Sequence, residues 1–401
     1  MKLVIVSHVT HYQHASSICA YGPYAREIDI WADLFAEVVI AAPLRSGEIP
    51  PGDCLPLTRK NISIVAQKET GGNNLSAKVA QILALPALIS GLTAVMRSAD
   101  AIHVRCPGNL GLLGLILAPL FSRRLIAKFA GQWNGYPGEE LTVRLQRAIL
   151  RSSWWKGPVT VYGCWPKQPP HVIPFFTSMM ADEQIVRAQN IAESKSITSP
   201  LRVLFCGRLA PEKRVDSLLH AIKLAVVGGL RLEVAIVGNG PERTKLFDQA
   251  SQLGIVNHLN FVGAVSFEKA LKWYEWAHCL VLPSTNSEGW PKVVAEAMCH
   301  GVLCIAVEHG QVPAMLKAKG ILLKHGSPHE IAGALQLLTE QPERFVPLMR
   351  AASQWAQQYS LEGLREALAT LLLDQWEKKT GQLAVDESLG RWQRVSKDVC
   401  L

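Results

Sequence analysis

Residues 279–298, with the sequence CLVLPSTNSEGWPKVVAEAM, combine a short apolar strand pattern, a polar turn and the start of a helix. Pro291 suits the first helical turn, where its missing N–H would have no partner, and Gly289 lets the loop backbone approach a ligand. This predicts Glu288 in the loop and Glu296 in the helix, about 7 to 8 Å further along the axis. Because a helix N-terminus favours phosphate, the stretch could hold a nucleotide lengthwise. An ordinary turn with two solvated glutamates explains it equally well.

The same strand-to-helix alternation runs through most of the chain and predicts a parallel α/β architecture. We expect two doubly wound, Rossmann-like domains at 1–177 and 201–342, facing each other across a cleft, with ligands at the carboxyl ends of the strands. The polar segment 178–200 is interpreted as a linker. Residues 343–401 are expected to form C-terminal helices and a tail that pack back toward the first domain. The expected strands are 2–6, 37–42, 62–66, 100–104, 124–129, 159–162, 171–173, 202–206, 232–237, 259–262, 279–282, 302–306 and 320–323.

A second group of charged residues follows the first strand of the second domain. Residues 207–213 read GRLAPEK. Gly207 allows a tight exit from the strand, while Arg208 and Lys213 set two cations beside the next helix. An arginine grips a phosphate with two hydrogen bonds and a lysine adds a mobile charge, so together they suit a diphosphate and the charge that develops when it leaves. A basic surface loop is the alternative.

Two further turns are weaker candidates for ligand contacts. Gly238 and Asn239 follow another strand and open another helix, but they lack the full Gly-x-Gly-x-x-Gly pattern of dinucleotide sites. Val262, at the end of the next strand, could offer backbone groups to a nucleobase. For Gly238 and Asn239, a plain strand-to-helix turn is at least as good an explanation as a ligand contact.

Taken in order, these features resemble the C-terminal nucleotide-sugar domain of family 4 glycosyltransferases, which are retaining enzymes of the two-Rossmann GT-B fold. The resemblance covers most of residues 200–340 and rests on the spacing of all the motifs together. It implies that Arg208 and Lys213 contact the donor diphosphate, that Glu288 contacts the donor sugar and that Glu296 binds the ribose hydroxyls. Donor-binding positions implied alongside them are Gly207, Gly238, Asn239, Val262, Gly289, Trp290, Val293 and Val294.

The N-terminal half matches that family less well. Its first loop lacks the Gly-Gly pair common in the family, and Gly131, after the 124–129 strand, lies where many members carry a histidine near the reacting sugar. Lys128 and Gly131 remain candidates for the acceptor side of the site. His103 matches a strand-end histidine of relatives, although a buried structural histidine is as good an interpretation.

Charge distribution and cysteine content indicate the expected cellular location of the protein. Residues 1–200 hold 19 Lys and Arg against 13 Asp and Glu, so the basic excess belongs mainly to this half. Basic residues there surround apolar helical stretches at 79–96 and 109–121, which suits an anionic membrane face as well as it suits buried helices. No pattern points to nucleic acid. Nine scattered cysteines predict reduced thiols in a cytoplasmic protein. The basic and apolar stretches would place it peripherally on the inner face of the cytoplasmic membrane.

The leading expectation is a cytoplasmic hexosyltransferase. It would move a hexose-type sugar from a nucleoside diphosphate sugar to a hydroxyl of a glycan, a lipid-linked or a small-molecule acceptor, with retention. We expect no metal, because no ligand cluster is visible, so Arg208, Lys213 and a helix dipole would bear the charge. The alternatives are a sugar nucleotide epimerase of GT-B-like fold, a less favoured oxidoreductase, and a catalytically silent nucleotide-sugar-binding partner of a membrane-associated complex.

Overall fold

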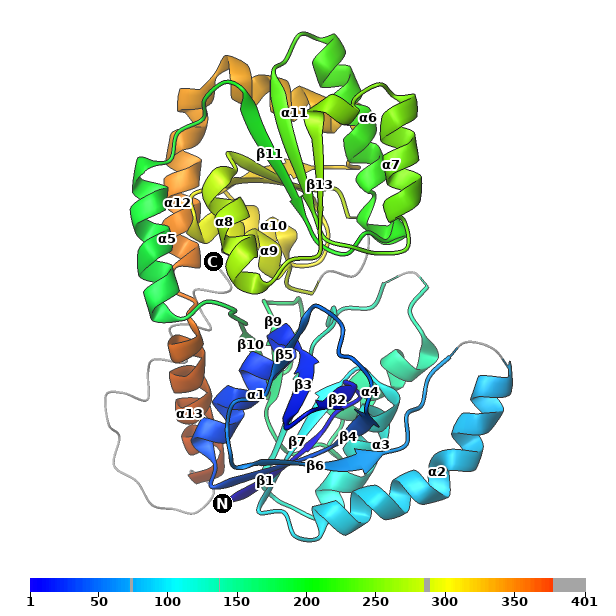
Figure 1. The fold of residues 1–401 in the computed structure, drawn as a ribbon. Coiled ribbons are helices and arrows are strands. Elements are labelled where there is room, and N and C mark those ends of the chain that lie inside the picture. The colour runs from blue at the N-terminus through cyan, green and yellow to red at the C-terminus, as the bar shows by residue number, and fades with distance from the viewer. Residues whose placement is uncertain (73–74, 137, 285–288, 378–401) are drawn as a thin grey trace. The chain divides into compact units, whose positions relative to one another are not determined.

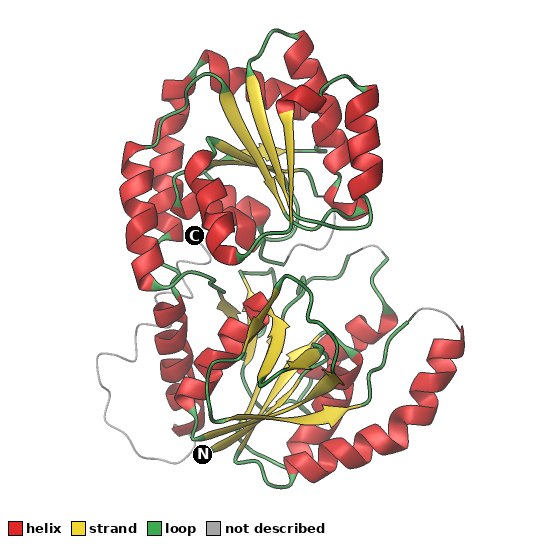
Figure 2. Ribbon diagram, viewed as in Figure 1, coloured by secondary structure: helices red, strands yellow, loops and turns green. Residues whose placement is uncertain are grey.

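The computed structural model describes residues 1–72, 75–136, 138–284 and 289–377, and it divides the chain into two compact units. Unit 1 comprises residues 1–176 together with the chain from 363 onward, and unit 2 comprises residues 177–362. Helices lie on both sides of the sheet in each unit (Figure 2). Each unit is therefore doubly wound, as the alternation of strands and helices predicted.

Unit 1 is built on a sheet whose parallel strands run in the order β10-β9-β8-β7-β1-β4, with β6 also parallel to β4. The order reverses at β1, since the chain adds β4 on one side of β1 and later β7 on the other. The strands are β1 (Lys2–Val6), β4 (Glu37–Ser46), β6 (Ile62–Gln67), β7 (Ala101–Cys106), β8 (Leu125–Phe129), β9 (Val159–Tyr162) and β10 (Val172–Phe175). The helices are α1 (Gly22–Leu34), α2 (Leu75–Met96), α3 (Asn109–Leu117), α4 (Leu141–Arg151) and α13 (Leu361–Glu377), with a short 3-10 turn, η1 (Ala118–Leu120).

The core of unit 1 lies between this sheet and helices α2, α3 and α4. Val4 and Val104 on neighbouring strands belong to one buried cluster with Leu88 and Leu92 of α2. Every residue of β8 is buried, as expected for a parallel strand covered on both faces. The helices α1 and α13 lie on the opposite side of the sheet (Figure 1), where the ring of Phe35 lies 6.2 Å from that of Trp376.

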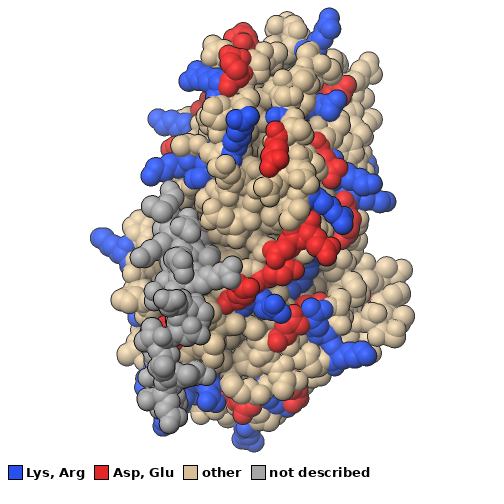
Figure 3. Space-filling view, turned by 90° about the vertical axis from the view of Figure 1, so that its left-hand side faces the viewer, with Lys and Arg blue, Asp and Glu red and all other residues tan. Residues whose placement is uncertain are grey.

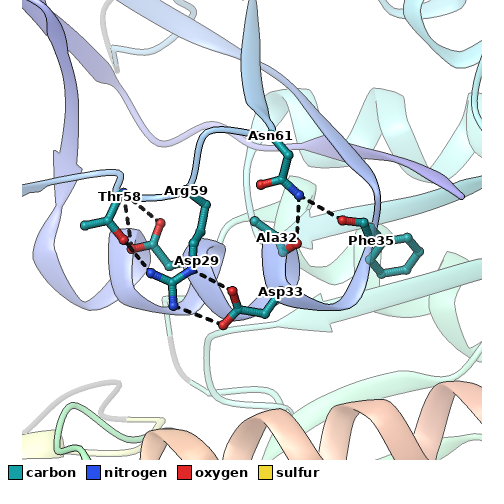
Figure 4. Close-up of polar contacts among 7 residues, drawn as sticks. All are labelled: Asp29, Ala32, Asp33, Phe35, Thr58, Arg59 and Asn61. Atoms are coloured by element: carbon teal, nitrogen blue, oxygen red, sulfur yellow. Dashed lines mark hydrogen bonds and ion pairs between the residues drawn. The ribbon is translucent and has the colours of Figure 1, made fainter.

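A polar network fixes the connection into β6 onto helix α1 (Figure 4). The backbone N–H and hydroxyl of Thr58 both donate to Asp29, and Arg59 pairs with Asp33. The side-chain amide of Asn61 donates to the carbonyls of Ala32 and Phe35 at 2.8 Å. It thereby satisfies carbonyls that the helix end leaves without intrahelical donors.

Unit 2 carries a six-stranded, all-parallel sheet in the order β13-β12-β11-β14-β15-β16. The order reverses between β11 and β14. The strands are β11 (Leu201–Cys206), β12 (Leu232–Val237), β13 (Leu259–Gly263), β14 (Cys279–Leu282), β15 (Leu303–Val307) and β16 (Ile321–Leu323). The helices are α5 (Asp182–Ser194), α6 (Val215–Val227), α7 (Arg243–Gln252), α8 (Phe267–Trp276), α9 (Lys292–Cys299), α10 (Val312–Leu316), α11 (Pro328–Glu340) and α12 (Val346–Ala356).

Alternating residues of the unit 2 strands form a buried core cluster with its helices. Val203 and Phe205 of β11 lie in it with Leu218 of α6 and Leu335 of α11. The 3-10 turn η2 (Pro211–Lys213) leads from β11 into α6. In Figure 1, α6, α7 and α11 cover one face of this sheet and α5, α8, α9 and α12 the other.

Three strands of unit 1 were not expected. The chain after β1 forms β2 (His11–His14) and β3 (Ser17–Tyr21), an antiparallel pair that β5 (Cys54–Pro56) extends. Their polar, irregular sequences lack the apolar runs that identified the parallel strands. Only β2 joins the main sheet, by pairing with the end of β4.

Two expectations about chain organisation differ from the structure. The segment 178–200 contains helix α5, which buries Ile185 and Ala188 and contacts α9 and α12, so it is part of unit 2 rather than a free linker. Helix α12 is also grouped with unit 2, and the chain rejoins unit 1 only at residue 363. The expectation that all cysteines are reduced is wrong at Cys164, which is disulfide-bonded, whereas the other described cysteines are free thiols.

Candidate nucleotide-sugar site

The two main sequence motifs follow the two strands that flank the reversal of strand order in unit 2. Residues 207–213 come directly after β11, and residues 283–291 come directly after β14, its neighbour in the sheet. In open α/β sheets, ligands bind outside the carboxyl ends of the strands at such a reversal. The topology therefore brings together motifs that are about 80 positions apart in the sequence, at the edge where a ligand is expected.

The loop after β11 is packed tightly onto the loop after β12. The N–H of Leu209 donates to the carbonyl of Asn239 at 2.9 Å. A Cβ atom on Gly238 would lie 1.9 Å from the carbonyl oxygen of Gly207, and Gly238 has a φ of +136°. Only glycine fits there, so the structure explains Gly238 by loop packing. Asn239 is exposed, and its side-chain oxygen accepts from the N–H of Gly240.

The two predicted diphosphate cations lie on this loop. Arg208 is exposed and Lys213, in η2, is half-buried. The next residue, Arg214, was not among the predicted site residues; it takes a left-handed φ of +50° and donates to the carbonyl of His325 at 2.7 Å. Arg214 thereby ties the cationic loop to the segment after β16. Its signal in the sequence was a third basic residue in the same motif.

Glu288, in the loop after β14, lies outside the described residues. Gly289, which follows it, is buried. Pro291 occupies the N-cap position of α9, close to its predicted place in the first turn. The side chain of Val294 is fully buried, its N–H donates to the carbonyl of Pro291 at 3.0 Å, and Val293 is half-buried. The amide of Val294 is thus already paired within the first turn.

Trp290 points into an aromatic cluster rather than lying open to a ligand. Its ring centroid lies 5.7 Å from that of Trp355 and 5.9 Å from that of Tyr359. Only 6% of Trp290 is exposed. Its large side chain therefore fixes the turn before α9 against the end of α12.

Glu296, the expected ribose anchor, projects from the middle of α9 and is hydrogen-bonded to Tyr274 of α8. The Tyr274 hydroxyl donates to Oε2 of Glu296 at 2.8 Å, and Tyr274 is fully buried. Burial raises the pKa of Tyr274 well above its ordinary value, so this hydroxyl stays protonated and remains a donor. Tyr274 has no motif of its own and was not foreseen.

The neighbours of this pair are also held in single protonation states. Burial raises the pKa of Cys206, at the end of β11, to about 12, so its thiol stays protonated. Burial lowers the pKa of His300 to about 4, and its Nδ1 lies 2.8 Å from the carbonyl of Glu296. Val262, at the end of β13, is half-buried. In the sheet, β12 separates its strand from β11, which carries the Arg208 loop.

Of the three candidates in unit 1, Lys128 and Gly131 lie at or just after the carboxyl end of β8, whereas His103 lies in the middle of β7 and not at the strand end that the resemblance implied. His103 of β7 is fully buried, with its ring 4.4 Å from that of Trp31. Burial, followed by the charge of Arg105, holds its pKa well below the ordinary value, so the ring is neutral. Gly131 is half-buried just after β8.

Lys128 is committed to a buried ion cluster. Its Nζ lies 2.7 Å from Glu27 of α1, whose other oxygen accepts from Arg105 at 2.6 Å. All three residues are less than a tenth exposed. Burial alone would raise the pKa of Glu27, but Arg105 and Lys128 outweigh it and hold that pKa far below its ordinary value. Glu27, on an otherwise apolar helix face, was missed because its partners lie 78 and 101 positions away.

Comparison with solved structures defines the class of fold. Over 93% of this chain, a structure of Anabaena Alr3699/HepE in complex with UDP superposes with a TM-score of 0.68 and 14% identity, covering 100% of that chain. Sucrose-phosphate synthase from Thermosynechococcus elongatus gives a TM-score of 0.69 at 16% identity over 93% of this chain and 98% of that one. The chain has the GT-B fold, as predicted.

Sequence comparison shows that unit 2 is similar to glycosyltransferases. Residues 186–358 match the family model described as Glycosyl transferases group 1. A D-inositol 3-phosphate glycosyltransferase from Streptomyces bingchenggensis is 31% identical over 179 residues, which cover 41% of this chain and 39% of that protein. The amylovoran biosynthesis glycosyltransferase AmsK of Erwinia amylovora is 25% identical over 170 residues, or 41% and 42% of the two chains. The chain spans about two fifths of the length of these curated relatives.

Proposed function

We propose that this chain is a retaining glycosyltransferase of family 4 that transfers a hexose-type sugar from a nucleoside diphosphate sugar to an acceptor hydroxyl. The observation that carries the proposal is the convergence of the Arg208–Lys213 loop and the turn into α9 at the reversal between β11 and β14. Group 1 glycosyltransferase similarity over the same unit supports it.

The chemistry of the two loops suits a diphosphate leaving group. Arg208 and Lys213 supply two cations on one short loop. The eight-residue helix α9 turns its N-terminal end, with positive partial charge, toward the same edge of the sheet. These charges would bind the diphosphate in the ground state and stabilise it more strongly as the sugar departs and negative charge builds up.

In the proposed reaction, the bond between the sugar's anomeric carbon and the phosphate oxygen breaks and the acceptor oxygen bonds to the same face of that carbon. The acceptor's proton passes to the leaving phosphate, so atoms and charges balance without a protein base. Glu296, held by Tyr274, is assigned to the ribose hydroxyls. Glu288, outside the described residues, is assigned to the sugar hydroxyls on the basis of its place in the motif.

The relatives suggest where a search for substrates should start. Alr3699/HepE has been solved with UDP-glucose, at a TM-score of 0.65 to this chain. UDP-glucose is therefore the first donor to assay. Names of relatives point to a phosphorylated cyclitol in one case and a polysaccharide in another. Accordingly the acceptor panel spans small polyols, glycans and lipid-linked sugars.

The decisive experiment is a donor panel assayed for hydrolysis and transfer with wild type, Lys213→Ala and Glu288→Ala. The matched control is Arg231→Ala, because Arg231 is exposed at the amino end of β12, on the opposite edge of the sheet. We expect turnover with one donor class, loss in both site variants and an unchanged control. The anomeric configuration of the product, read by NMR, tests retention. Donor binding without any turnover would instead support the silent partner.

A further inference from the structure

Helix α2 exposes an apolar face that the fold does not cover. Its inward face, with Leu88 and Leu92, lies in the core of unit 1. On the opposite face Ile82 is 65% exposed and Leu83 75% exposed, with Val79 and Ile89 also exposed. These outward residues recur at helical spacing. A helix that is apolar on every side is typical of full burial or of contact with a membrane.

Helix α4 continues this apolar surface beyond α2. Leu141 and Leu145, one turn apart, are both exposed. The two helices are joined by a groove that Ile82 of α2, Leu112 of α3 and Thr142 of α4 line together. We define the α2–α4 surface as Val79, Ile82, Leu83, Ile89, Leu141 and Leu145. Figure 1 shows α2 along the outer edge of unit 1.

Basic residues lie within and around this surface. Lys78 lines the same groove. Arg144 stands between Leu141 and Leu145 in the sequence, and its side chain remains 56% exposed although its Nε lies 3.6 Å from Glu139. Residues 70–181 hold eleven Lys and Arg against three Asp and Glu, although three of these cations, Arg105, Lys128 and Arg147, are buried. On the face drawn in Figure 3, by contrast, acidic and basic side chains are interspersed. Lys78 and Arg144 are the cations that lie on or beside the apolar surface.

We propose that the α2–α4 surface docks unit 1 onto an anionic phospholipid bilayer, with the apolar side chains in the interfacial region and the basic ones at the headgroups. Apolar residues interleaved with cations match the chemistry of such a surface. The Trp154 ring, just after α4, is 44% exposed while its Nε1 donates to the carbonyl of Leu115. Exposed tryptophan rings favour the membrane interface.

The helix lies on the bilayer and does not cross it. Among the described residues, 78–96 form a helix long and apolar enough to span a membrane by length and composition. Its buried face, however, supplies Ala84, Leu88 and Leu92 to the core of unit 1. Insertion across the bilayer would strip these side chains from the core, whereas interfacial docking uses only the face that is already exposed.

The test is flotation of the full chain with vesicles of phosphatidylcholine containing about one third phosphatidylglycerol, at low and high salt. The apolar variant is Ile82→Glu/Leu83→Glu. Its matched control is Leu224→Glu/Val227→Glu, a pair of exposed apolar residues on α6 in unit 2. We expect wild type to bind at low salt, the first variant to bind at least about tenfold more weakly, and the control to stay within about twofold.

The charge variant Lys78→Gln/Arg144→Gln separates headgroup attraction from apolar insertion. We expect binding at low salt to weaken about fivefold for each cation removed, with a smaller loss at high salt; Arg231→Gln/Lys245→Gln is the control. Absence of wild-type binding, equal binding to pure phosphatidylcholine, or equal loss in the controls would overturn the proposal. So would a dimer, detected by light scattering, that Ile82→Glu/Leu83→Glu dissociates while vesicles stay unbound.

Discussion

Cations stand beside the reversal of strand order in both units, but they are used differently. In unit 1, Arg105 and Lys128 are buried and share Glu27 as an internal partner. In unit 2, Arg208 is exposed and Lys213 half-buried, on a loop at the carboxyl edge of the sheet. One topology thus places a buried ion cluster in the first unit and a cationic loop at the edge of the sheet in the second. The comparison predicts that the first set governs stability and the second governs donor chemistry.

The largest expected effect is on stability and comes from Glu27→Gln. Removing this carboxylate leaves two buried cations without their counter-charge, and breaking a buried pair typically costs about 3–5 kcal/mol of unfolding free energy. Chemical denaturation measures it. Glu37→Gln is the control, because Glu37 pairs with Lys2 at the surface, where a loss of about 0–1 kcal/mol is typical. Equal losses in the two variants would show that the buried cluster is not a stability element.

The same carboxylate sets an acid limit on stability. The folded-state pKa of Glu27 lies far below its ordinary value of 4.5. Its contribution is therefore complete above pH 4.5 and is lost as the pH falls toward the folded-state pKa. Unfolding free energy measured from pH 6 downward should decline for wild type below that value, and more steeply than for Glu27→Gln. Parallel curves for the two proteins would rule out Glu27 as the source.

The next largest effect is expected in unit 2, on turnover. Lys213→Ala removes one of two cations proposed to stabilise the leaving diphosphate, and loss of one such group typically lowers kcat by about 10²–10³. Stability should change by less than about 1 kcal/mol, because the side chain lies on a loop. Steady-state kinetics with the identified donor, beside a denaturation curve, measure both. A large loss of unfolding free energy with a normal kcat would contradict the comparison, because the cationic loop of unit 2 would then govern stability and not turnover.

The contrast also explains which parts of the molecule could be predicted from sequence. Parallel strands such as β1 and β14 are continuous apolar runs, and the loops of unit 2 keep their chemistry within a few neighbouring residues. The hairpin β2–β3 has no such run. The Glu27 cluster and the Tyr274 to Glu296 hydrogen bond join residues 22 or more positions apart. Only the folded sheet brings them together, so local patterns carry no trace of them.

A smaller effect is expected from Tyr274→Phe. This variant removes the hydroxyl that donates to Glu296, and a hydrogen bond to a charged group is worth about 1.5–3 kcal/mol. Tyr274 is a positioning residue, so the loss should appear as an approximately tenfold higher donor KM, with kcat nearly unchanged. Binding of the nucleoside diphosphate by calorimetry checks it.

A double-mutant cycle decides whether Tyr274 acts through Glu296. In a Glu296→Gln background the Tyr274→Phe change should weaken donor binding no further, because the carboxylate that it orients is gone. Additive losses would mean that Tyr274 supports the site by another route, such as packing on Cys206 and the end of β11.

The smallest effect is expected from His103→Leu in unit 1. In the described structure neither ring nitrogen of His103 has a hydrogen-bond partner, and its pKa lies well below the ordinary value because the ring is buried and faces Arg105. Replacing an unpaired buried polar group by an apolar one of similar size is close to neutral. We expect unfolding free energy within about 1 kcal/mol of wild type and an unchanged pH–rate profile. If kcat falls steeply while the unfolding free energy is unchanged, His103 takes part in the reaction. Buried residues of unit 1 would then contribute to catalysis as well as to stability.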